Sequence, residues 1–192
     1  MMWWAALGEG LSDTKLKEFD KDYSAFREST YVNCWSLSPD ESYALWKIYW
    51  DGRGSGVAIR STVSRVQKAL SISERTIFDG KVRYSNFERD LLSLDQMVMT
   101  KLPVYKYESE YRLFYVQSIS EEMQGQGFFS SLVPSTLEKN RVDVDLEELV
   151  DRIVISPFAP SWLSGVIRQV VGEFAPFLVS KIDNSAIEFT ER

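Results

Sequence analysis

Alternating side chains mark the segment 105–116 as the clearest strand in the chain. The segment is rich in aromatic and β-branched residues, which is typical of a strand. Because successive side chains of a strand point to opposite faces, one face would carry the charged residues Lys106, Glu108, Glu110 and Arg112. Beyond Arg112 both faces become apolar, as in an interior strand. The pattern therefore predicts a central strand whose charged half lies at the end of a buried surface, where a sheet often opens into a cleft.

Helical spacing of apolar residues predicts several helices. Residues 14–28 carry a single apolar stripe, as in an amphipathic helix. Ser38, with Pro and Glu at the next and third positions, forms a capping box for a helix that runs to about residue 50. Because that helix is apolar nearly all round, we expect it to be mostly buried. Helices are also predicted from about 86 to 100 and from about 160 to 174, the last with Leu163, Val166, Ile167, Val170 and Val171 facing inward.

The remaining apolar runs predict strands. They cover residues 31–35, 57–60, 141–145, 152–156, 177–180 and 186–189. Asp79 and Gly80 lie between two short apolar runs and predict a hairpin with a type I′ turn. Together these elements predict one α+β domain over residues 1–192, with a mixed, mostly antiparallel sheet flanked by helices.

The composition narrows the classes of function. The 192 residues, 44% of them hydrophobic, are enough to bury the core of one domain. The net charge of −6 argues against nucleic acid as the main partner, because that binding needs a positive surface. No apolar window is long enough to cross a membrane, and the first residues lack the basic start of a secretory signal. We therefore expect a cytoplasmic protein.

The chain contains no histidine and one cysteine, Cys34. This excludes Ser-His-Asp and Cys-His nucleophiles, histidine-ligated metals, intrachain disulfides and cysteine zinc sites. Cys34 lies within a predicted strand, where packing is its commoner role. Catalysis would have to use carboxylates, Lys, Tyr, Ser or a metal held by oxygen ligands.

Several short blocks occur in an order and spacing that resemble a known bacterial family. The blocks are residues 31–36, 45–49, 56–60, 81–84, 107–112 and 152–157. They resemble the bacterial domain of unknown function family 2971 (DUF2971). The resemblance implies a fold but no reaction, and it implies that this chain lacks an upstream N-terminal segment that relatives carry before the position of Trp3. Some relatives look like phage-resistance proteins, which implies a role in phage defence.

Glu108 and Glu110 resemble the Glu-x-Glu motif of ADP-ribosyltransferases of the Arg-Ser-Glu class. In that class the second Glu holds a ribose hydroxyl of NAD and stabilises the cationic transition state, which suits a carboxylate. The resemblance implies that Glu110 is catalytic, that Glu108 assists and that NAD is the candidate cofactor. Ser36-Leu37-Ser38 resembles the class's serine motif with Leu in place of Thr, and the class's early-strand Arg has no clear match. The expected ligand-binding residues are Arg112, Lys106, Ser36, Arg60 and Tyr49.

Other interpretations of the same residues stay open. The charged positions of the central strand are also typical of a cross-strand ion-pair ladder. The six tryptophans, two of them at Trp3 and Trp4, favour a non-enzymatic sensing or interaction module that binds a protein partner or a second copy through that end. A metal hydrolase is the weakest alternative, because Glu108 and Glu110 alone are too few ligands for a divalent ion.

Overall fold

The computed structural model describes residues 13–49, 56–86, 94–117 and 141–187. It confirms the α+β class, and three of the five strand pairs in the described residues are antiparallel. The chain divides into two compact units, which are described separately. Unit 1 comprises Met1–Leu37 and Arg75–Arg141, and unit 2 comprises Ser38–Glu74 and Val142–Arg192. The assignment of residues 1–192 to one domain stays a prediction.

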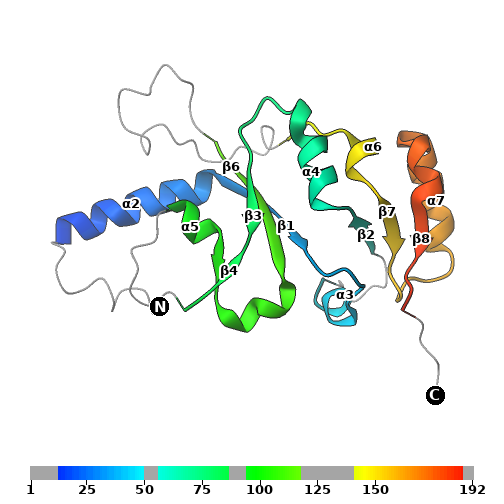
Figure 1. The fold of residues 1–192 in the computed structure, drawn as a ribbon, viewed down its shortest axis with the longest axis horizontal. Helices are drawn as coiled ribbons and strands as arrows, with labels where there is room; N and C mark the ends of the chain where they lie inside the picture. The colour runs from blue at the N-terminus through cyan, green and yellow to red at the C-terminus, as the bar shows by residue number, and fades with distance from the viewer. Residues whose placement is uncertain (1–12, 50–55, 87–93, 118–140, 188–192) are drawn as a thin grey trace. The chain divides into compact units, whose positions relative to one another are not determined.

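Unit 1 is built around strand β6 (Figure 1). Its sheet has the order β1-β6-β3, with both neighbours antiparallel to β6, and a parallel pair, β4-β5, forms a second small sheet. The elements in chain order are α2 (Asp13–Ser29), β1 (Thr30–Ser36), β3 (Phe78–Lys81), β4 (Arg83–Tyr84), α5 (Leu94–Val98), β5 (Thr100–Lys101), the 3₁₀ helix η2 (Pro103–Glu108) and β6 (Glu110–Val116).

The predicted central strand is confirmed only for its second half. Residues 105–108 belong to η2, which begins at Pro103, and Ser109 has a left-handed backbone with φ 45°. Proline at the first turn favours a helical start, and the left-handed residue ends it and redirects the chain into β6. The prediction that Lys106 and Glu108 share a strand face with Glu110 was therefore wrong.

The predicted hairpin at Asp79 and Gly80 was also wrong. Both residues lie inside β3, where they face Leu113 and Arg112 of β6. Pairing with the longer strand β6 outweighs the local turn preference of Asp-Gly. Gly80 has a packing role, since a Cβ atom there would lie 3.2 Å from Met99 Cε.

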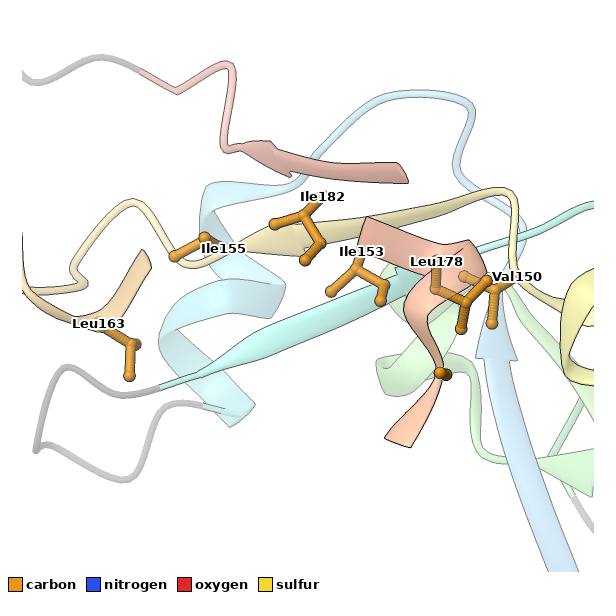
Figure 2. Packing of buried hydrophobic residues seen from close by; sticks show 7 residues of the cluster. Val150, Ile153, Ile155, Leu163, Leu178 and Ile182 are labelled. Carbon is orange, nitrogen blue, oxygen red and sulfur yellow. The ribbon is translucent and has the colours of Figure 1, made fainter. Parts of the chain in front are cut away.

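Unit 2 is organised around strand β7, in a sheet of order β2-β7-β8 with β2 antiparallel and β8 parallel to β7. Figure 2 shows Ile153 and Ile155 of β7 near Leu178 and Ile182, which lie in one buried cluster with Val150 and Leu163. The elements are α3 (Tyr43–Tyr49), β2 (Val57–Arg60), α4 (Val63–Ala69), the 3₁₀ helix η1 (Leu70–Ile72), α6 (Leu146–Leu149), β7 (Arg152–Ile155), α7 (Leu163–Phe174), the 3₁₀ helix η6 (Pro176–Lys181) and β8 (Ile182–Asn184).

Helix α3 differs from the prediction in its start and its burial. It begins at Tyr43, and Ser42 caps it by accepting from the Leu45 N–H at 3.3 Å, so the capping box at Ser38 does not form. None of its described side chains is buried, and Tyr49 is 72% exposed. The prediction that this helix is mostly buried, which rested on its apolar composition, was therefore wrong.

Two strands predicted for unit 2 are not found there, and a third prediction lies partly outside the described residues. Residues 177–180 lie in η6, which starts with Pro176. Residues 141–145 contain no strand. Asp145, the last of them, instead caps α6 by accepting from the Glu147 and Glu148 N–H groups. Residues 186 and 187 lie outside any strand, and residues 188 and 189 lie outside the described part of the chain. The Trp3-Trp4 end also lies outside it.

Candidate functional site

Four charged side chains of unit 1 form a charge network, which we define as Lys101, Glu108, Glu110 and Arg112. Lys101 ends β5, Glu108 ends η2, and Glu110 and Arg112 share one face at the start of β6. The left-handed Ser109 turns the chain between the two glutamates. This turn lets both carboxylates reach Lys101, although only Glu110 lies on the strand.

The network is closed by short contacts between opposite charges. Lys101 Nζ lies 2.6 Å from Glu108 Oε2 and 2.7 Å from Glu110 Oε1. The other oxygen of Glu110, Oε2, accepts from Arg112 Nε at 2.6 Å, and Arg112 Nη1 also donates to the Val98 carbonyl. Both oxygens of Glu110 are thus bound to cations, and the two positive and two negative charges of the network cancel.

Burial makes these contacts stronger than those of a surface ion pair. Glu108 is 7% exposed and Glu110 is 5% exposed. Burial alone would raise the pKa of Glu110, but hydrogen bonds with Glu108, Lys101 and Arg112 outweigh it and lower that pKa to about 2. For Lys101, burial would lower the pKa, but hydrogen bonds to Glu108 and Glu110 raise it. The network therefore favours the charged forms of Glu110 and Lys101.

Backbone contacts hold the network in place. The Glu110 N–H donates to the Tyr84 hydroxyl at 2.8 Å, and the Ser36 hydroxyl donates to the Glu108 carbonyl at 3.0 Å. The Leu37 N–H donates to the Ser109 carbonyl at 2.8 Å. Ser36 also faces Glu110 across the β1–β6 pair. Strands β1, β4 and β6 therefore fix the turn that carries the two glutamates.

The structure brings together four of the predicted site residues, Ser36, Glu108, Glu110 and Arg112. Lys106 is exposed on η2 and takes no part in the charge network. The other two lie in unit 2, where Arg60 is 3.8 Å from the Asp151 carboxylate and Tyr49 is exposed at the end of α3. Sequence reasoning missed Lys101 and Tyr84, which enter the site through β4 and β5. Lys101 ends a strand of only two residues, which is too short to show the alternating pattern by which a strand is predicted from sequence.

Cys34 faces Arg112 across the β1–β6 pair. Although the residue as a whole is exposed, desolvation of the thiol and the negative charge of Glu110 raise the pKa of Cys34, outweighing the opposite effect of Arg112. A reactive cysteine needs a lowered pKa. The raised pKa argues against a reactive thiol, but the buried packing role that the sequence predicted for Cys34 was wrong, because the residue is exposed.

Beside the charge network the chain exposes an aromatic loop, which we define as residues 102–107. The ion pair between Lys101 and Glu108 closes this loop at its base. Val104 is 71% exposed and Tyr107 is 55% exposed, and Leu102 and Tyr105 are exposed as well. The Lys101 ammonium also lies 4.7 Å from the centre of the Tyr105 ring, which anchors that side chain to the base.

Two further features are absent from the described residues. These residues contain no group of three or more His, Cys, Asp or Glu side chains that could hold a metal ion. None of their helices has the length and apolar character needed to cross a membrane.

No protein-family model matches the chain, and neither a curated protein nor a solved structure matches it. The resemblance to DUF2971 therefore stays a prediction.

Proposed function

We propose that the chain is a protein-interaction module in which unit 1 presents the aromatic loop to a protein partner and the charge network forms its rigid base. The observation that carries the proposal is the Lys101–Glu108 ion pair at 2.6 Å, which joins the two ends of the loop. A loop that carries binding residues on a rigid scaffold is a common arrangement in recognition proteins.

Preorganisation is what the charge network would contribute to binding. The start of the loop is held by the β4–β5 pair and by the Ser85 N–H, which donates to the Lys101 carbonyl at 3.1 Å. Its end is held by the contacts of Ser36 and Leu37 with residues 108 and 109. A loop ordered before binding loses less conformational entropy when it meets its partner.

The exposed side chains of the loop define the chemistry of the partner. Val104 and Tyr107 offer an apolar and an aromatic surface, and tyrosine is enriched at the centre of protein interfaces. Lys106 adds one exposed positive charge between them. The fitting partner is a protein surface with an apolar pocket and an acidic group at its rim.

Loop variants test this proposal. We expect a bait carrying Val104→Ser and Tyr107→Ser to lose partners that the wild-type chain retains after chemical cross-linking, because those two are the most exposed large apolar side chains of the loop. Tyr43→Ser removes a similarly exposed tyrosine from α3 in unit 2 and is the matched control. Quantitative mass spectrometry of the recovered proteins gives the comparison. Recovery of the same proteins by wild type and loop variant would contradict the proposal.

A second candidate is an NAD-dependent ADP-ribosyltransferase that acts as a cytoplasmic phage-defence effector, as the resemblances imply. One observation favours it: Ser36 faces Glu110 in the strand register, and Glu108 shares the cation that binds Glu110. For this chemistry a ribose hydroxyl would have to reach the Glu110 carboxylate, which is 5% exposed and already binds Lys101 and Arg112, so these contacts would have to rearrange. The charge network makes that rearrangement costly, so we rank this function second.

A further inference from the structure

An apolar ridge runs along the exposed side of α7. We define it as Trp162, Val166, Val170 and Phe174, which follow one another at intervals of four residues. Trp162 is 62% exposed, Phe174 is 79% exposed, and the two valines are nearly half exposed. The prediction that Val166 and Val170 face the core was therefore wrong. The core of unit 2 is packed by the neighbouring stripe of Leu163, Ile167 and Val171.

The surroundings of the ridge are unusual for a helix that faces water. A surface helix normally carries charged residues opposite its buried stripe. The only cation of α7, Arg168, instead bonds within unit 2, where its guanidinium donates to the Ile182 carbonyl at 3.0 Å. The positions that precede the four ridge residues are Ser161, Gly165, Gln169 and Glu173, of which only the exposed Glu173 is charged. One carboxylate, beside Phe174 at the end of the ridge, would therefore have to be desolvated or stay at the rim when this side of the helix is covered.

Gly165 adds an independent observation. It is exposed within the helix, and a Cβ atom built there would have no heavy atom within 4 Å. Packing inside the chain therefore gives no reason for glycine, although glycine is among the poorest helix formers. A missing side chain next to a ridge of four-residue spacing leaves a groove, and such grooves accept the ridge of a second helix.

We propose that this ridge is a homodimer interface, in which α7 of one copy packs antiparallel against α7 of a second copy. The order of the ridge is aromatic, valine, valine, aromatic, so it reads alike in both directions. A two-fold axis between Val166 and Val170 would place Trp162 against Phe174 of the second copy. Such self-complementarity is what a two-fold symmetric interface requires.

The exposed area is sufficient for a weak dimer. Together with Phe177, which is half exposed just beyond α7, the ridge exposes on the order of 500 Å² of apolar surface, given about 150–250 Å² for each aromatic side chain. Two copies would bury about 1,000 Å², which is near the lower limit for a specific interface. We therefore expect a dissociation constant in the micromolar range.

Sedimentation velocity of the full chain from about 1 to 200 μM tests this inference. We expect wild type to shift from one copy toward two, and we expect Val166→Gln/Val170→Gln and Gly165→Leu to weaken the dimer at least about tenfold. Gly165→Leu is the sharper variant, because the free space around Gly165 means that it should keep or raise the melting temperature measured at the lowest concentration. Ile72→Gln changes an exposed apolar residue of η1, outside both the ridge and the aromatic loop, so it is the matched control and should dimerise as wild type does.

Two results would overturn the inference. One is a wild-type chain that stays a monomer at 200 μM, which would mean that the ridge meets another partner or another part of this chain. The other is a dimer that both ridge variants form as tightly as wild type, which would place the interface elsewhere, such as the Trp3-Trp4 end. Neither result bears on the aromatic loop, so the inference and the proposed function can fail independently.

Discussion

Lys101→Met is expected to destabilise the protein by about 3–5 kcal/mol, which is the usual cost of removing one partner from a buried ion pair. The substitution would leave Glu108 without its 2.6 Å contact and would leave one oxygen of Glu110 unpaired. Both carboxylates are almost fully buried, whereas the Lys101 side chain is 24% exposed, so water can replace the lost ammonium only in part. Urea unfolding at neutral pH measures the effect through the shift in midpoint.

Lys68→Met is the matched control for this measurement. Lys68 lies 2.7 Å from Glu148, a distance close to that of the buried pairs, but the Lys68 side chain is 71% exposed. Exposed pairs contribute about 0–1 kcal/mol, so this variant should unfold almost as wild type does. The double variant Lys101→Met/Glu108→Gln should be less destabilised than Lys101→Met, because no buried charge is left without a partner at residue 108. Equal costs for Lys101→Met and Lys68→Met would contradict a stabilising network.

Acid is expected to remove stability, on the order of 3 kcal/mol, through Glu110 and the groups bound to it. Its pKa is about 2 in the folded chain and near 4.5 when unpaired, so between these values the unfolded chain binds more protons. The contribution of Glu110 is thus present above about pH 4.5 and is lost as the pH falls toward 2. One pH unit corresponds to about 1.4 kcal/mol, which sets the size of the effect.

Comparison of wild type with Glu110→Gln isolates this contribution. Both proteins lose stability in acid through their other carboxylates, but only wild type should show the additional loss between pH 4.5 and 2. Urea unfolding at several pH values gives the two curves, and their difference should narrow as the pH falls. A constant difference across this range would show that Glu110 titrates normally in the folded chain.

The sequence predicted those helices and strands whose formation follows from the apolar pattern of their own residues. The two apolar faces of β6, the amphipathic stripe of α2 and the run of β7 all form the expected elements. Periodicity could not decide between two neighbouring apolar stripes of α7, so Val166 and Val170 were placed inside although they lie outside. It also could not foresee that pairing with β6 would draw Asp79 and Gly80 into a strand.

For the site, the sequence identified Glu108, Glu110 and Arg112 but gave them the wrong geometry. It placed all three on one strand face, whereas Glu108 lies on η2 and reaches the others through Ser109 and Lys101. The left-handed conformation of Ser109 and the approach of β5 both depend on tertiary contacts. Residues that meet in the fold but belong to different short elements have no regular spacing in the sequence, so a sequence pattern cannot predict their contact.

The most direct test of the central claim is a titration of the full wild-type chain with NAD, followed by thermal shift and by nicotinamide release. Because Glu110 is 5% exposed and is held by Lys101 and Arg112, our account predicts no change in melting temperature up to millimolar NAD and no release above buffer. A saturable rise in melting temperature, together with nicotinamide release that Glu108→Gln or Glu110→Gln abolishes while the variant remains folded, would contradict it. That result would make the charge network an active site instead of the base of a binding loop.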